Sequence, residues 1–262
     1  MTLPIFHVDA FADEPFLGNP AAVCLMPGPW DDRWMQHVGR EMNLSETAFL
    51  YSENDGYRLR WFTPRVEVDL CGHATLASAH VLWEEGRLRP GEQAVFYTRS
   101  GRLVSERRDE WIEMDFPSVP AEPFTPPFDI AAILGTDPRW IGKNRWDYLV
   151  EVVSEDALRR MTPDIAAMQE LPVRGVIITA RATTKFDFVS RFFAPGAGVA
   201  EDPVTGSAHC CLGPYWREKL GKDEMLAYQA SERGGVVGVR IAADRTYLRG
   251  KAVTVLRGEL LC

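Results

Sequence analysis

Hydrophobic and polar residues alternate along many short stretches of the chain, which is the pattern of strands with one buried face. These stretches are rich in β-branched and aromatic residues. In the first half they are residues 5–11, 21–26, 46–51, 57–62, 94–98 and 111–116, and in the second half residues 148–153, 175–180, 186–193, 235–241 and 252–258. The pattern predicts a protein built mainly of β-structure.

Three segments have the pattern of helices instead. Residues 31–42 begin with an Asp cap and are amphipathic, which predicts a surface helix. The segments that follow Gly72 and Gly206 carry apolar or small residues on nearly every side, as a helix enclosed by a sheet does. We expect Gly213 and Pro214 to kink or interrupt the second of them. Each half of the chain therefore reads as a curled sheet around one central helix.

The two halves also resemble each other in sequence. The segment RWFTPRVEVDLCGHA from Arg60 aligns with RFFAPGAGVAEDPVTGSA from Arg191, and residues 99–104 align with 232–237 in the same order. Chance similarity of short loop and helix signals is the alternative explanation. We interpret the chain as two copies of one module.

A proline-rich stretch separates the two copies. Prolines at 117, 120, 123, 126 and 127 are too frequent for a helix or a central strand and are typical of an extended linker. We therefore predict an N-terminal module at residues 1–117, a linker at 118–127 and a C-terminal module at 128–262.

Composition and charge exclude several classes of function. The 262 residues are 46% hydrophobic and 25% charged, and the net charge of −8 without basic clusters argues against binding of nucleic acid. We find neither a signal-peptide pattern nor an apolar run long enough to span a membrane. A cytoplasmic protein without a membrane partner is the expectation.

Cysteine and histidine spacing gives no metal or disulfide motif. The five cysteines form no CxxC pair and leave one thiol over, which favours reduced thiols. The histidines show no HxxxH or HExxH spacing. We predict no metal site, and we expect Cys210 and Cys211 to pack in the core.

Each predicted central helix starts at a glycine-led turn, where free N–H groups and the helix dipole favour an anion. If a pseudo-twofold axis relates the modules, Gly72–His73 and Gly206–Ser207 face one cleft and can hold a carboxylate between them. Phosphate is the rival anion, but GAG at 196–198 lacks the Gly-Lys-Ser/Thr that follows in a P-loop.

Four motifs in this order resemble the PhzF family, the phenazine-biosynthesis-like isomerases. They are GNPAAV at 18–23, MNLSETAFL at 42–50, VDLCGHATLASAH at 68–80 and EDPVTGSAH at 201–209. The resemblance implies an α+β, diaminopimelate-epimerase-like fold with two pseudo-symmetric domains, each a curled β-sheet or barrel around a central helix. It also implies a homodimer, no metal or organic cofactor, and a last strand at about 250–262 that crosses back to the first module.

The resemblance further implies an active site. Glu46 matches the glutamate that moves a proton between carbons of a dihydro-hydroxyanthranilate, and His73, Asp202 and Ser207 match the other active-site positions. An enclosed apolar cleft disfavours a charged carboxylate, so the pKa of Glu46 can rise toward the working pH and allow it to accept and return a proton.

Further positions are expected to bind substrate. They are Cys71, Gly72, Thr205 and Gly206 at the two helix starts, together with Asn19, which the resemblance places in the pocket although a Gly-Asn-Pro turn explains it equally well. The predicted function is a cofactor-independent isomerase of a small carboxylate, either amino-acid-like or cyclic, acting in an interdomain cleft.

Two alternatives stay open. Epimerases of the same fold use one cysteine at each helix start, and Cys71 holds the first place while Thr205 holds the second. Because Thr has no thiolate-like state near neutral pH, two-base racemisation is disfavoured, and Cys71 is either a base acting with Glu46 or a small buried hydrophobe. The second alternative is a carboxylate-binding protein that performs no chemistry.

Overall fold

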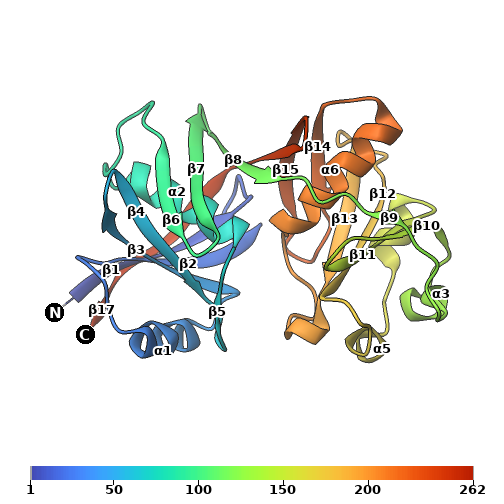
Figure 1. Cartoon of the computed structure of the whole chain (residues 1–262), viewed down its shortest axis with the longest axis horizontal. Coiled ribbons are helices and arrows are strands. Elements are labelled where there is room, and N and C mark those ends of the chain that lie inside the picture. Colours follow the sequence, from blue (N-terminus) through green and yellow to red (C-terminus); the bar gives the residue numbers. More distant parts are fainter. Residues whose placement is uncertain (1, 262) are drawn as a thin grey trace. The chain divides into compact units, whose positions relative to one another are not determined.

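A computed structural model describes residues 2–261 of the chain, so Cys262 lies outside the described residues. The chain divides into two compact units. Unit 1 consists of the residues up to Asp115 together with those from Arg249 onward, and unit 2 is Phe116–Leu248. The chain leaves unit 1 within strand β8 (Trp111–Pro117) and returns to it within strand β16 (Arg245–Gly250) (Figure 1).

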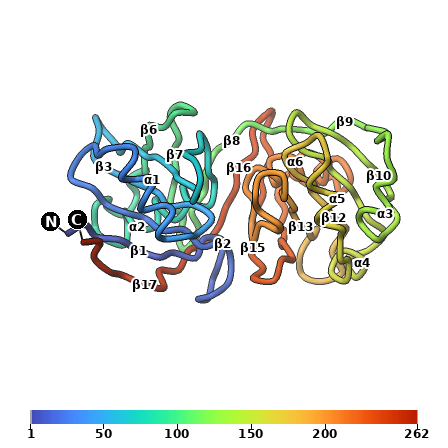
Figure 2. Tube along the Cα trace, turned by 90° about the horizontal axis from the view of Figure 1, so that it is seen from below, coloured from blue at the N-terminus to red at the C-terminus, as the bar shows by residue number. Residues whose placement is uncertain are grey.

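Unit 1 is a strongly curved arrangement of strands around helix α2 (Gly72–Glu84). The other strands of this unit are β1 (Thr2–Ala10), β2 (Asn19–Leu25), β3 (Glu46–Glu53), β4 (Gly56–Phe62), β5 (Glu67–Val68), β6 (Ala94–Thr98), β7 (Gly101–Arg108) and β17 (Ala252–Leu261). The last strand, β17, pairs antiparallel with β1, and the two run side by side in Figure 2. Strands from both ends of the sequence thus form one unit.

Helix α2 packs against β1, β2, β3 and β17, and ten of its residues are buried. This burial explains why the helix lacks a polar face. Helix α1 (Asp32–Met42) lies on the surface as predicted, with the Asp31 side chain accepting a hydrogen bond from the Trp34 N–H at its start. It ends at Asn43, which adopts the left-handed conformation.

Unit 2 has the same plan around helix α6 (Gly206–Leu220). Its other strands are β9 (Glu122–Pro123), β10 (Pro138–Lys143), β11 (Asp147–Val152), β12 (Gly175–Arg181), β13 (Phe188–Phe193), β14 (Glu224–Gln229) and β15 (Gly235–Ala242). Its short helices are α3 (Ile130–Leu134), α4 (Glu155–Arg160), α5 (Ile165–Gln169) and the 3-10 turn η1 (Pro195–Ala197). Trp216 of α6 stacks on Phe188 of β13 and donates its indole N–H to Thr179 of β12, which fixes the helix against the strands.

Within each unit, neighbouring strands pair in the same alternating order of antiparallel and parallel pairs. In unit 1, β1–β2 is antiparallel, β2–β3 parallel, β3–β4 antiparallel, β4–β6 parallel and β6–β7 antiparallel. In unit 2, the pairs β10–β11, β11–β12, β12–β13, β13–β14 and β14–β15 follow the same alternation. In both units the central helix begins after the strand that occupies the fourth place of this succession (β4 or β13).

Helix α6 is continuous through Gly213 and Pro214, so the expected interruption is wrong. Proline at position 214 removes the N–H that would bond to the carbonyl of Cys210. That carbonyl instead accepts a hydrogen bond from the Val119 N–H, at 3.0 Å. Gly213 allows the helix to approach β15, since a Cβ there would lie 2.6 Å from Ile241 Cδ1. Among the described residues, no helix is long and apolar enough to cross a membrane.

Candidate active site

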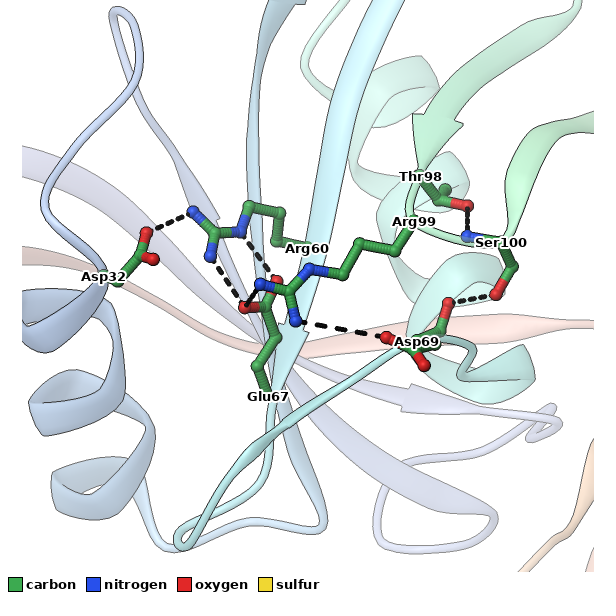
Figure 3. A network of polar contacts seen from close by, with 7 residues as sticks. All are labelled: Asp32, Arg60, Glu67, Asp69, Thr98, Arg99 and Ser100. Carbon is green, nitrogen blue, oxygen red and sulfur yellow. Dashed lines mark hydrogen bonds and ion pairs between the residues drawn. The ribbon is translucent and has the colours of Figure 1, made fainter.

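A network of ion pairs holds the loop that leads into α2 (Figure 3). Arg60 donates two hydrogen bonds to the Glu67 carboxylate, both at 2.7 Å, and one to Asp32 of α1, also at 2.7 Å. Arg99, in the turn between β6 and β7, forms an ion pair with Glu67, with Nη2 2.6 Å from Oε2. The guanidinium of Arg60 is largely buried, and its bonds to the Glu67 carboxylate raise its pKa, so it stays charged. The loop before α2 is therefore fixed by charge pairs.

The aligned arginine of unit 2 does the same for the loop before α6. Arg191 donates to both oxygens of Glu201, at 2.7 and 2.8 Å, and also to the carbonyls of Leu158 and Met161. Bidentate arginine–carboxylate pairs fix orientation as well as distance. In each unit, a partly buried arginine thus holds the loop that leads to the central helix.

Glu46 and His73 meet at the start of α2. Glu46 is the first residue of β3, and His73 is the second residue of α2. The His73 Nε2 atom lies 3.2 Å from Oε2 of Glu46, a separation over which a proton can be passed, although the ring N–H is not aligned for a hydrogen bond. Only 7% of the His73 side chain and 18% of the Glu46 side chain are exposed.

The thiol of Cys71 contacts the other ring nitrogen of His73, with Sγ 3.5 Å from Nδ1. Burial lowers the pKa of His73 to about 3, so the imidazole is neutral at physiological pH. A neutral ring has one N–H and one acceptor nitrogen. The three side chains form a chain in which imidazole separates the thiol from the carboxylate.

The same three residues offer ligand atoms of the kinds that bind zinc, all within 4.8 Å of one another. A zinc ion with bonds of about 2.0–2.3 Å would require the thiolate and the carboxylate to approach the same imidazole nitrogen. Here they contact opposite nitrogens. With the imidazole between the thiol and the carboxylate, this geometry does not favour chelation, and the absence of a metal stays a prediction.

Two other predicted residues lie at this place in unit 1. Ala21 of β2 pairs with Glu46 of β3, and Asn19 is two residues before Ala21. Because side chains alternate between faces along a strand, Asn19 shares the face of Glu46. Asn19 is fully buried.

Helix α2 begins at Gly72, after the N-cap residue Cys71. The Cys71 side chain makes no capping hydrogen bond, so the first N–H groups of the helix are available to an anion.

Unit 2 holds the remaining predicted residues at the start of α6. Thr205 precedes Gly206 and, like Cys71, makes no side-chain capping bond to the helix. Its hydroxyl instead donates a hydrogen bond to the Asp202 carboxylate. Asp202 and Thr205 are therefore paired with each other.

Sequence reasoning missed Gln229, which organises this turn. Gln229 is fully buried at the end of β14. Its Oε1 accepts from the Thr205 N–H at 2.9 Å, and its Nε2 donates to the Asp202 carbonyl at 2.7 Å and to the Thr205 hydroxyl at 3.2 Å. No sequence motif includes Gln229, because its partners are distant in sequence and come close to it only in the folded protein.

Sequence reasoning also missed Arg174, which contacts Ser207. The Nη2 atom of Arg174 donates to the Ser207 hydroxyl at 3.0 Å, and the same guanidinium pairs with Asp147. The predicted residues thus form two clusters. Asn19, Glu46, Cys71, Gly72 and His73 lie together in unit 1, and Asp202, Thr205, Gly206 and Ser207 lie together in unit 2.

Comparisons with known proteins show the family to which the chain belongs. A family model described as phenazine biosynthesis-like protein matches residues 8–258. Over its whole length the chain is 56% identical to a protein of Halalkalibacterium halodurans that is named an uncharacterized isomerase, of which the match covers 99%.

Solved structures confirm the predicted α+β fold. The crystal structure of a PhzF-family phenazine biosynthesis protein from Enterococcus faecalis matches with a TM-score of 0.97 and 40% identity, and all of both chains is covered. A hydroxyproline epimerase from Agrobacterium vitis matches with a TM-score of 0.64 over 99% of this chain and 92% of its own, but at 11% identity it shares the fold alone. Because the family model and the relatives span nearly the entire sequence, the chain belongs to the PhzF family of phenazine biosynthesis-like proteins.

Proposed function

We propose that the protein is a cofactor-independent isomerase of a small carboxylate, in which Glu46 moves a proton between two carbons of the substrate. The observation that carries this proposal is the contact between the Glu46 carboxylate and a neutral, buried His73, at 3.2 Å. The H. halodurans relative, named an isomerase, supports the reaction class.

Glu46 acts first as the base and then as the acid. Its carboxylate takes a proton from one carbon, and the resulting carboxylic acid returns a proton to another. A positioned group of this kind supplies about 10²–10⁴-fold of rate. Because its pKa is about 3, His73 does not compete for the proton as an imidazolium, and its neutral ring lies 3.2 Å from the carboxylate.

The start of α2 supplies the binding of the anionic substrate. The N–H groups at Gly72 and His73 have no side-chain cap, and the positive end of the helix dipole lies there. Asn19, on the face of Glu46, provides an amide for a polar substituent of the substrate. In unit 2, Asp202 and Ser207 are proposed to bind the polar groups of the same substrate, which the resemblance implies.

The contact of Cys71 with His73 favours one second candidate, an epimerase in which Cys71 and Glu46 act as the two bases. Thr205 stands where epimerases of this fold have their second cysteine, and its hydroxyl is engaged by Asp202. An epimerase would therefore need Glu46 in place of the missing thiol.

Proton NMR in D₂O tests both candidates. The wild-type protein and the Glu46→Gln variant are incubated with dihydro-hydroxyanthranilate and a panel of small amino and hydroxy acids. We expect rearrangement or exchange of a carbon-bound proton with one substrate, and a loss of about 10²–10⁴-fold in Glu46→Gln. The matched control is Glu53→Gln, at the other end of β3, where the carboxylate pairs with Arg58.

Retained turnover in Glu46→Gln would remove Glu46 from the mechanism. Binding of panel members without any proton exchange would favour a carboxylate-binding protein. The homodimer and the cytoplasmic location stay predictions.

A further inference from the structure

Arg174 lies one residue before Gly175, which is the residue of unit 2 that corresponds to Glu46 in unit 1. Glu46 begins β3, which pairs in parallel with β2, and Arg174 directly precedes β12, which pairs in parallel with β11. Each of these residues contacts the second residue of the central helix. Glu46 lies 3.2 Å from His73, and Arg174 lies 3.0 Å from Ser207.

The two side chains start one residue apart in the corresponding strands, and they differ in charge. The unit 1 position carries a carboxylate that can exchange a proton, whereas the unit 2 position carries a guanidinium, which stays protonated in proteins. A guanidinium cannot act as the base, but it can bind a carboxylate through parallel N–H donors. The difference assigns proton transfer to one helix start and recognition of charge to the other.

The guanidinium of Arg174 is held rigidly. Asp147, whose side chain is only 1% exposed, accepts from Nε at 2.9 Å and from Nη2 at 2.5 Å. The rings of Trp146 and Phe192 each lie 5.5 Å from the guanidinium carbon, at a distance typical of cation–π contacts. Arg174 thus loses little further freedom when it binds a ligand.

One edge of this guanidinium remains for a ligand. Of its five N–H donors, Asp147 uses two and Ser207 uses one, which leaves both hydrogens on Nη1 without a hydrogen bond among residues 2–261. The Arg174 side chain is 37% exposed, while Asp147 is buried behind it. A solvent-borne anion therefore meets the guanidinium and not the aspartate.

We propose that Arg174, together with the Ser207 hydroxyl, binds a carboxylate group of the substrate and so determines specificity for carboxylates over their neutral amides. This inference rests on the proposed function, because it names the group by which the isomerase recognises its substrate.

The test uses 2-aminobenzoate as a carboxylate probe and 2-aminobenzamide as its neutral counterpart, with acetate as a second carboxylate. Resonances of the Arg174 Nε–H and the Ser207 amide are followed by ¹H–¹⁵N NMR during titration at constant ionic strength. We expect saturable shifts with both carboxylates, no matching response to the amide, and affinity for 2-aminobenzoate at least about tenfold weaker in Arg174→Gln.

Arg145→Gln is the matched control, because it changes the net charge by the same amount. Arg145 is exposed, and its guanidinium lies over the ring of Trp146, at 3.6 Å, which Arg174 also contacts. Arg174→Gln leaves Asp147 buried without its partner, so the Arg174→Gln, Asp147→Asn double variant serves if the single variant unfolds. Arg174→Lys keeps the positive charge but lacks the parallel N–H donors of a guanidinium. We expect its affinity for 2-aminobenzoate to lie between those of the wild type and Arg174→Gln.

Absence of a saturable response to both carboxylates in the wild-type protein would overturn the proposal, and so would equal affinities in the wild type and Arg174→Gln. Both results are read without turnover. A failure of Glu46 to exchange protons therefore leaves this test standing, and a failure of this test leaves the Glu46 chemistry untouched.

Discussion

The Sγ atom of Cys71 lies 3.5 Å from Nδ1 of His73, on the side of the ring away from the nitrogen that faces Glu46. The ring is neutral, because burial lowers its pKa to about 3. A neutral imidazole can pass a proton between its two neighbours by exchanging tautomers, without ever becoming a cation. Whether the thiol takes part in turnover separates the isomerase from the epimerase.

We predict that Cys71→Ala keeps turnover within about tenfold of wild type, whereas Glu46→Gln loses about 10²–10⁴-fold. The reason is that a carboxyl which both accepts and returns the proton needs no second base. Proton exchange in D₂O measures both variants. Cys24→Ala, at another fully buried thiol of unit 1, controls for packing. A loss in Cys71→Ala as large as that in Glu46→Gln would identify the epimerase.

Much of this fold followed from local pattern. Each predicted strand is present, because short runs of β-branched and aromatic residues favour paired strands. Strands β11 and β12 are buried along nearly their whole length and not only on alternate residues. Strand β7 was not predicted, since its sequence GRLVSERR is polar on both faces. Strand β10 begins with Pro138 and carries few apolar residues, and its place is set by pairing with β11. Such strands depend on partners that are distant in sequence.

The site was predictable only where a motif carried it. Glu46 and His73 were found through the resemblance, whereas Gln229 and Arg174 act through contacts that span 24 and 33 residues of sequence. The Cys210 carbonyl, which Pro214 leaves without a donor in α6, accepts a hydrogen bond from Val119, far outside the helix. Local propensity has no access to partners of this kind, and tertiary contacts decide the outcome.

Acid should destabilise the folded protein through two histidines. Burial lowers the pKa of His73 to about 3 and that of His209 to about 4, below the value of about 6.5 in an unfolded chain. Between about pH 6.5 and 4 the unfolded chain therefore binds protons that the folded chain does not. The free energy of unfolding falls as the pH falls, by up to about 1.4 kcal/mol per pH unit for each histidine.

Urea unfolding between pH 7 and pH 5 measures this slope. In His209→Asn the slope should be shallower, because the amide can still donate to the Thr205 carbonyl, 2.9 Å from Nδ1, but cannot be protonated. His37→Asn, at an exposed position, is the matched control and should keep the wild-type slope. Identical slopes in all three proteins would contradict the burial of a neutral His209.

Gln229→Leu should destabilise the protein by about 2–4 kcal/mol, because it leaves the Thr205 N–H and the Asp202 carbonyl without their partner inside the fold. Urea unfolding at pH 7 gives the change. Gln93→Leu replaces an exposed glutamine that bonds to Glu106, and it should cost less than about 0.5 kcal/mol. Equal effects of the two substitutions would show that the Gln229 bonds contribute nothing to stability.

The hydrogen bond from Val119 to Cys210 can be tested by exchanging one donor for another. Val119→Pro removes the N–H that serves the Cys210 carbonyl, which should cost about 1–3 kcal/mol in the free energy of unfolding. Pro214→Ala supplies a helical N–H to the same carbonyl. In that background, Val119→Pro should cost less, because the carbonyl retains a donor.

Urea unfolding of the four proteins closes this double-mutant cycle. Val119→Ala, which shortens the side chain but keeps the N–H, measures how much of the effect comes from packing. A coupling energy above about 0.5 kcal/mol between Val119→Pro and Pro214→Ala is the expected result. If Val119→Pro instead costs the same in both backgrounds, its effect comes from the backbone restriction of proline, and the continuity of α6 must have another cause.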